Sequence, residues 1–170
     1  MNQYCMNCGH QLEKKIIENR KREICPLCGW VNYIQLKVTA GMLVVQDSRL
    51  LLVQRAMEPW KDYWYLPAGY VENDETPLKA AEREVREETG LEIKARRLEN
   101  IYFYNDDPRG NGLLILYSGR VVGGNIKINR EAKAIRYFYP EEIRALKLAG
   151  GSHNLAIRDF LVKISKVDAK

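Results

Sequence analysis

Residues 69–91, GYVENDETPLKAAEREVREETGL, decide how the rest of the chain is interpreted. Three acidic residues in this stretch, Glu84, Glu87 and Glu88, stand at positions i, i+3 and i+4, so a helix would carry them on one face. Like charges at this spacing weaken an isolated helix. A hard divalent cation reverses that effect, because Mg²⁺ takes carboxylate oxygens as ligands. The stretch therefore predicts a metal-binding helix in preference to a solvated acidic face.

Local signals set the bounds of this helix. Asp74 or Thr76 can cap its start, and Pro77 is tolerated in its first turn. Gly90 is a normal C-terminal stop. Upstream, residues 38–55 contain two apolar runs joined by a polar turn at 46–49. That pattern predicts a buried strand hairpin before the helix.

The chain after the helix alternates strand and loop signals. Strands are expected at 91–104, 113–122, 126–128 and 134–139, with the first one broken near residues 96–97. A helix follows from Pro140, and a last helix begins at Ser152, which can cap it. We expect His153, near the start of that helix, to be a surface or capping residue.

Length and composition limit the class of protein. The chain has 170 residues, enough for one domain and a small module, and 46% hydrophobic with 29% charged residues is a globular composition. Its formal charge of +5 suits an anionic small molecule and does not require nucleic acid. The sequence shows neither a membrane-spanning run nor a secretory signal, so we expect a cytoplasmic protein.

Two Cys-x-x-Cys pairs, separated by sixteen residues, stand at the N-terminal end: Cys5 with Cys8, and Cys25 with Cys28. Disulfides fit poorly in a chain without an export signal. Four cysteines close a tetrahedron, so we predict a structural zinc site without His10 as a ligand. Residues 1–35 are expected to form a zinc ribbon around a short hairpin, with the metal supplying its folding energy. Residues 36–170 are expected to form a second domain.

The central stretch resembles the signature of the Nudix hydrolases. That signature is Gly, five residues, Glu, seven residues, Arg-Glu, an aliphatic residue, any residue, Glu-Glu, any residue, Gly and an aliphatic residue. The chain supplies every fixed position: Gly69, Glu75, Arg83, Glu84, Val85, Glu87, Glu88, Gly90 and Leu91. The resemblance covers about residues 36–170. It implies an α+β class and the Nudix fold, in which a mixed β-sheet is sandwiched between helices.

The resemblance also assigns roles at the metal site. Glu84, Glu87 and Glu88 would bind Mg²⁺ or Mn²⁺, and Ala68 would add its carbonyl. Arg83 and Glu75 match positions that pair and support the loop and the helix. Glu131, in a loop before the last strand, is the candidate for a further acidic residue. Either Glu84 or Glu131 would take the proton of the attacking water, and the sequence leaves that choice open.

Candidates for substrate binding are more scattered. Arg55 ends the second strand of the expected hairpin, and Glu72 lies in the loop beside the metal. Tyr102, Tyr104 and the aromatic loop at 60–65 have rings on which a base can stack, although core packing explains such residues equally well.

A zinc ribbon before a Nudix domain is similar to the NADH pyrophosphatase branch and to shorter relatives acting on ADP-ribose or FAD. Residues 99–112, ENIYFYNDDPRGNG, depart from the Ser-Gln-Pro-Trp-Pro-Phe-Pro-like stretch of the NADH pyrophosphatases. The resemblance implies metal-dependent hydrolysis of the pyrophosphate bond of a nucleoside diphosphate derivative of the ADP-ribose, FAD or NADH type, releasing a nucleoside monophosphate. The alternatives are a (d)NTP pyrophosphohydrolase and a ligand-sensing, nucleic-acid-binding regulator. Homodimers are common in the resembled group.

Overall fold

The computed structural model describes residues 3–167. The chain divides into two compact units, Met1–Gln35 and Leu36–Lys170. None of the helices within residues 3–167 combines the length and the apolar composition that a membrane crossing requires.

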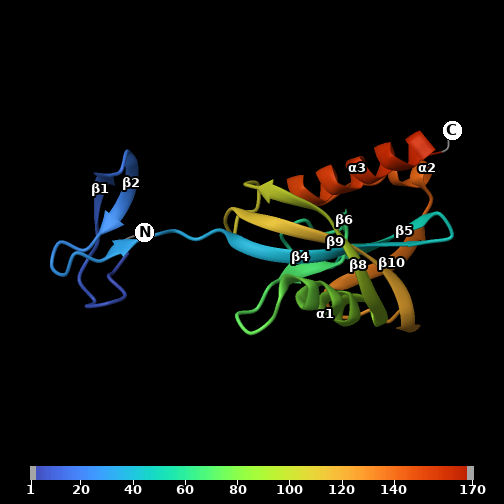
Figure 1. The fold of residues 1–170 in the computed structure, drawn as a ribbon, viewed down its shortest axis with the longest axis horizontal. Helices are drawn as coiled ribbons and strands as arrows, with labels where there is room; N and C mark the ends of the chain where they lie inside the picture. The colour runs from blue at the N-terminus through green and yellow to red at the C-terminus, as the bar shows by residue number, and fades with distance from the viewer. Residues whose placement is uncertain (1–2, 168–170) are drawn as a thin grey trace. The chain divides into compact units, whose positions relative to one another are not determined.

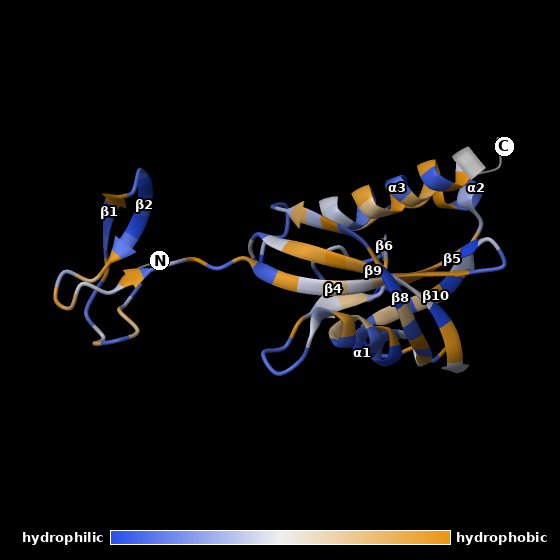
Figure 2. Ribbon diagram, viewed as in Figure 1, coloured by the Kyte–Doolittle hydropathy of each residue, from blue (hydrophilic) through white to orange (hydrophobic). Residues whose placement is uncertain are grey.

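The N-terminal unit is a three-stranded antiparallel sheet in the order β1 (Glu13–Ile17), β2 (Arg20–Ile24) and β3 (Val31–Asn32). The hairpin expected between the cysteine pairs is confirmed: β1 pairs β2, and Glu18 and Asn19 turn the chain with φ values of 50° and 59°. Among the described residues of this unit only Cys5 and Cys25 are buried, and β2 is hydrophilic throughout most of its length (Figure 2). The unit therefore has almost no hydrophobic core.

The second unit is built on a mixed sheet of seven strands. The main path runs β10-β5-β4-β9-β8, while β6 pairs β5 and β7 pairs β4. Only β4 and β9 run parallel. The strands are β4 (Lys37–Gln46), β5 (Arg49–Arg55), β6 (Trp64–Tyr65), β7 (Ala68–Tyr70), β8 (Leu91–Tyr104), β9 (Gly112–Gly124) and β10 (Ala132–Phe138).

Helices cover both faces of this sheet (Figure 1). They are α1 (Pro77–Thr89), α2 (Pro140–Ile143) and α3 (Gly151–Val167). On one face, Ala80, Ala81 and Val85 of α1 pack in the cluster that contains Met42 and Val53. The other face meets α3 through a cluster that contains Ala156, Ile157 and Phe160. The Nudix fold implied by the signature, a mixed sheet between helices, is the fold observed.

Local signals placed α1 correctly. The Thr76 side chain accepts a hydrogen bond from the Lys79 backbone N–H, and Pro77 is the first helical residue. Gly90 ends the helix in a left-handed conformation with φ of 77° and donates its N–H to the Arg86 carbonyl. The predicted turn between the two apolar runs is also present, since β4 ends at Gln46 and β5 begins at Arg49.

Three details downstream differ from expectation. Residues 126–128 form no strand, because they belong to the loop before β10, where Lys127 donates its backbone N–H to the Thr89 carbonyl at 2.8 Å. Ser152 does not cap α3: the helix begins at Gly151, and the Gly151 N–H is donated to the Asp106 carboxylate at 2.6 Å. Near residues 96–97 the strand β8 is continuous but shifts register.

Candidate active site

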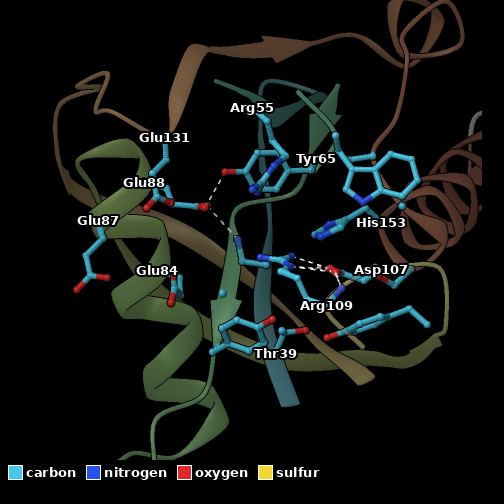
Figure 3. Close-up of a pocket in the computed structure, with 18 of the residues that line it drawn as sticks. Thr39, Arg55, Tyr65, Glu84, Glu87, Glu88, Asp107, Arg109, Glu131 and His153 are labelled. Atoms are coloured by element: carbon cyan, nitrogen blue, oxygen red, sulfur yellow. Dashed lines mark hydrogen bonds and ion pairs between the residues drawn. The ribbon is translucent and has the colours of Figure 1, made fainter. Parts of the chain in front are cut away.

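A cavity of about 610 Å³ opens in the second unit. Its walls come from the strands β4 to β7, from α1, from the loops before β9 and β10, and from the start of α3. Figure 3 shows Glu84, Glu87 and Glu88 of α1 on one side of this cavity together with Glu131 from the loop before β10. The four carboxylates that the sequence nominated are thus brought together on one wall.

Glu88 is the most enclosed of these carboxylates, with only 5% of its surface exposed. Its Oε1 accepts a hydrogen bond from the Tyr65 hydroxyl at 2.7 Å, and its Oε2 accepts one from the Ala68 N–H at 3.1 Å. Burial raises the pKa of Glu88 to about 8, the negative charges of Glu84 and Glu131 add to the rise, and the two hydrogen bonds oppose it. A carboxylate has about four lone-pair sites. Tyr65 and Ala68 therefore fix its orientation and leave oxygen positions for a cation.

Arg83 holds the remaining carboxylates of α1 in place. Its Nη2 lies 2.6 Å from Glu75 Oε1, as the signature implies. Its Nη1 lies 2.7 Å from Glu84 Oε1 and 2.9 Å from Glu87 Oε2. The hydrogen bond from Arg83 lowers the pKa of Glu75, whereas burial raises the pKa of Glu84. The guanidinium thus offsets part of the repulsion that the glutamate face creates.

Gly69 stands where the backbone of β7 passes closest to α1. A Cβ atom at this position would overlap the Glu84 carboxylate. Glycine at this position of the signature therefore has a steric reason, since a larger residue would displace the Glu84 carboxylate from its place beside the strand.

The loop that carries Glu131 is fastened to the end of α1. Asn129 donates its side-chain N–H to the Glu87 carbonyl at 2.8 Å, and its Oδ1 accepts the backbone N–H groups of Glu131 and Ala132. These bonds hold Glu131 beside the helix although it lies more than forty residues further along the chain.

Three of the four predicted substrate-binding residues line the cavity, and one does not. Arg55, Glu72 and Tyr104 line the cavity. Tyr102 does not: its hydroxyl donates to Asp159 of α3 at 2.8 Å, and it lines a separate cavity under that helix. Tyr102 and Tyr104 are two residues apart on one strand, so their side chains share a face. The sequence therefore could not show that only Tyr104 lines the cavity.

Several site residues were missed by sequence reasoning. Tyr65 binds Glu88, and Asp107 pairs with Arg109 at 2.6 Å on the opposite wall. The hydrogen bond from Arg109 lowers the pKa of Asp107. Tyr65 was considered only as a ring for base stacking, because its bond to Glu88 joins residues 23 positions apart. Asp107 and Arg109 are only two residues apart, but no motif of the sequence marks this pair.

The expectation for His153 was wrong, because the imidazole lines the cavity and stacks edge-on against Tyr65 at a centroid distance of 5.6 Å. Its Nδ1 is buried and has no hydrogen-bond partner among the described residues. Burial, with the positive charge of Arg55, lowers the pKa of His153 to about 4. One signal was available: His153 is the only histidine in residues 36–170.

The cysteine cluster of the N-terminal unit has a geometry that could hold a second metal ion. The four Sγ atoms lie within 4.8 Å of one another, and three pairs are 3.5 Å apart. None of the four forms a disulfide. Tetrahedral zinc with Zn–S bonds of about 2.3 Å requires sulfur separations of about 3.8 Å, so the donor set fits that ion. Gly9 and Gly29 take left-handed conformations and close two equivalent turns onto Cys5 and Cys25.

Comparison with known families agrees with both sites. The model of the NUDIX domain matches residues 35–160, and the model described as Nudix N-terminal, a zinc ribbon, matches residues 3–34. The chain belongs to the Nudix family of hydrolases. Within this family it is 32% identical to the ADP-ribose pyrophosphatase of Methanocaldococcus jannaschii over 154 residues, which are 90% of this chain and 86% of that protein.

Two further Nudix proteins extend the comparison. The NAD-capped RNA hydrolase NudC of Stutzerimonas stutzeri is 29% identical over 84% of this chain but only 50% of its own length. The crystal structure of a NUDIX hydrolase from Nitrosomonas europaea superposes with a TM-score of 0.78 at 28% identity, covering 92% of this chain and 89% of that one. Both units of the chain therefore have counterparts in Nudix hydrolases.

Proposed function

We propose that this Nudix hydrolase cleaves the pyrophosphate bond of ADP-ribose or a closely similar nucleoside diphosphate derivative and releases a nucleoside monophosphate. The observation that carries the proposal is the convergence of Glu84, Glu87, Glu88 and Glu131 on one wall of a single cavity. Its volume of about 610 Å³ suits a nucleotide-sized ligand. Similarity to an ADP-ribose pyrophosphatase along most of both chains supports this substrate.

Oxygen donors on the glutamate wall fit Mg²⁺ or Mn²⁺. We assign Glu84, Glu87 and Glu88 as ligands, with the Ala68 carbonyl, and we assign zinc to the four cysteines. When bound, the divalent cation neutralises phosphate charge, polarises the P–O bond and lowers the pKa of a bound water.

The residues of the chain then have separate tasks. Glu88 is held by Tyr65 and Ala68, so its orientation does not depend on the ligand. Glu84 shares its carboxylate with Arg83, whereas Glu131 enters none of the ion pairs between residues 3 and 167. We therefore assign Glu131 as the group that accepts the proton of the attacking water. Oxygen of that water bonds to phosphorus, and the bridging P–O bond breaks.

Positive charge inside the cavity assists binding of the anionic substrate. Arg55, Arg109 and Arg130 line it. Arg55 is held in position because its Nε donates to the Pro59 carbonyl at 2.8 Å. These guanidinium groups favour phosphate oxygens and reduce the repulsion from the acidic wall.

The test is a product-resolved substrate panel of ADP-ribose, FAD, NADH and nucleoside triphosphates with Mg²⁺ and with Mn²⁺. We expect AMP and ribose 5-phosphate from ADP-ribose. Pyrophosphate released only from triphosphates would replace the proposal by the (d)NTP pyrophosphohydrolase. Absence of turnover together with salt-dependent binding of RNA or DNA would replace it by the regulator.

Substitutions of the glutamates that line the cavity test whether these residues are responsible for the activity. Glu131→Gln is expected to lower the turnover number by about 10² to 10⁴, the range for loss of a general base. Glu88→Gln is expected to abolish turnover together with metal binding. Glu141→Gln, an exposed glutamate of α2, is the matched control and should be fully active. Full activity of Glu88→Gln would contradict the site. Homodimer formation stays a prediction, which light scattering tests.

A further inference from the structure

The end of the cavity opposite the glutamates differs from them in chemistry. Figure 3 shows His153 on that side, with Tyr65 between it and Glu88. Trp60, Ala149 and Gly150 line the cavity as well. We propose that Trp60 and His153 form the subsite for the nucleobase and determine which nucleotides the enzyme accepts. This inference rests on the proposed function and assigns the base of the substrate to a place in the cavity.

Trp60 is presented to the cavity by a strained loop. Its φ is +69°, and Asp62 also has φ of +69°, a conformation that bulky side chains rarely adopt. The strain is held by surrounding bonds: Arg55 donates to the Pro59 carbonyl, Gln54 donates to the Asp62 carbonyl at 3.0 Å, and Lys133 pairs with Asp62 at 2.7 Å. Such outliers persist where the structure over-determines them and point to function. An indole face is a platform on which a base can stack.

His153 supplies a polar group beside that platform. Its Nδ1 is buried and has no partner among the described residues, so the ring meets the cavity through its other atoms, of which Nε2 is the polar one. Buried N–H groups without an acceptor are rarer in proteins than buried acceptors without a donor. We therefore place the proton of the neutral imidazole on Nε2 and leave Nδ1 as the unprotonated nitrogen. Burial keeps the imidazole neutral, since the pKa is lowered to about 4. The ring therefore offers one neutral donor to an acceptor atom of the ligand.

Asp106 completes the polar surroundings. A Cβ atom on Gly150 would lie 3.8 Å from Trp60 Nε1 and 3.9 Å from Asp106 Oδ2, so all three groups border the same end. Asp106 accepts the Gly151 N–H at 2.6 Å and lines the cavity. The Asp106 carboxylate disfavours a phosphate group in the space next to Trp60, whereas Arg55 and Arg109 remain available to phosphates elsewhere in the cavity. Together with the neutral imidazole, this carboxylate favours a flat neutral ring with an acceptor nitrogen and an amino group, which is the hydrogen-bonding edge of adenine.

The test uses the two products of ADP-ribose hydrolysis as probes of the intact chain. AMP carries the base and ribose 5-phosphate does not. The chain has only two histidines, and His10 lies in the N-terminal unit, so it is an internal reference. In long-range ¹H–¹⁵N spectra of histidine-labelled protein, we expect AMP to shift the imidazole resonances of His153 and to leave those of His10 in place. Ribose 5-phosphate should shift neither.

Kinetics supply an independent measurement. His153→Phe keeps the aromatic contact with Tyr65 and is expected to raise KM for ADP-ribose about tenfold with kcat within about twofold. Trp60→Leu should raise KM about 10- to 100-fold. His10→Phe is the matched control with unchanged KM.

Two outcomes distinguish a failure of the base subsite from a failure of the proposed function. Competitive inhibition by AMP that leaves the His153 resonances unmoved, in an enzyme that hydrolyses ADP-ribose, would overturn the base subsite and leave the proposed function standing. Failure to release AMP from ADP-ribose would overturn the function and the subsite with it.

Discussion

The two proposed metal sites of this chain lie in surroundings that differ strongly in burial. In the N-terminal unit the only buried described residues are Cys5 and Cys25, two members of the cysteine cluster itself. In the second unit two hydrophobic clusters fill the space on both faces of the sheet, and Glu84, Glu87 and Glu88 of α1 line the cavity beside them. A metal held by the four cysteines would take the place of a hydrophobic core. A metal held by the glutamates would bind to a unit that already has a hydrophobic core.

The difference shows what orients the ligands. Tyr65, the Ala68 N–H and Arg83 position the glutamates without any ion. The cysteines are held by their turns, by contacts with one another and by Asn7, whose backbone N–H and side chain donate to Cys5 and Cys28. Perturbations should consequently affect the two units separately, and their sizes should reflect this contrast.

Removal of zinc should have the largest effect. Structural zinc contributes about 10–16 kcal/mol to the folding of small modules, so a chelator should unfold residues 3–35 completely. The second unit should keep its structure. Amide hydrogen exchange, read residue by residue, measures both. Exchange rates in β1 and β2 that do not change after zinc is lost would contradict the comparison.

Truncation of a core side chain should destabilise the second unit and leave the N-terminal unit folded. Leu52 is fully buried in the cluster beneath α3. Leu52→Ala is expected to lower the free energy of unfolding of the second unit by about 2–5 kcal/mol through lost contacts and a cavity. The N-terminal unit should keep its zinc. Chemical denaturation measures the change, and Val45→Ala, at a site that is 38% exposed, is the control. Equal losses in both variants would refute the assignment of the core.

Acid should destabilise the second unit through His153. Burial lowers its pKa to about 4 in the folded state, against about 6.5 when unfolded. Between these two pH values the unfolded chain binds more protons than the folded one. The contribution of neutral His153 to the free energy of unfolding is therefore fully present above about pH 6.5. It is lost as the pH drops toward 4, by up to about 3 kcal/mol. His153→Phe should lack this slope. Because Glu84 and Glu88 titrate in both proteins, the difference between the two stability curves isolates His153. Parallel curves would exclude the predicted burial cost.

Tyr65→Phe should have the smallest energetic effect and the most specific one. It removes the 2.7 Å hydrogen bond to Glu88 and leaves the ring in place. Loss of such a supporting contact typically weakens metal binding by 10- to 100-fold, or about 1.4–2.7 kcal/mol. Electron paramagnetic resonance of Mn²⁺ measures the affinity. Tyr117→Phe is the matched control, because Tyr117 is a partly buried tyrosine that packs against the cluster containing Tyr65. Unchanged affinity would show that Tyr65 does not orient Glu88.

The features that sequence reasoning placed correctly depend mostly on local contacts. The glutamate face, the cap at Thr76, the stop at Gly90 and the paired cysteines depend on neighbours a few residues apart. The spacing of the signature also identified Gly69. In the structure the Glu84 carboxylate lies where a side chain at this position would be.

Long-range contacts escaped the same reasoning. The bond from Tyr65 to Glu88 spans 23 residues, and the position of His153 depends on how α3 packs against the sheet. Tyr102 was misplaced because the sequence does not show that Asp159 of α3 receives its hydroxyl. Residues 126–128 have strand-forming side chains, but the bond from Lys127 to Thr89 holds them as a loop.

The attachment of the Glu131 loop to α1 has an evolutionary consequence. Because Asn129 and Lys127 bind the carbonyls of the last turn of the helix, the acidic half of the cavity is connected as one structural unit. The opposite half comes from the Trp60 loop, the loop before β9 and the start of α3. Insertions or exchanges in those segments alter what the enzyme selects without moving the carboxylates, so descendants of one ancestor can diversify in substrate while they keep the same chemistry.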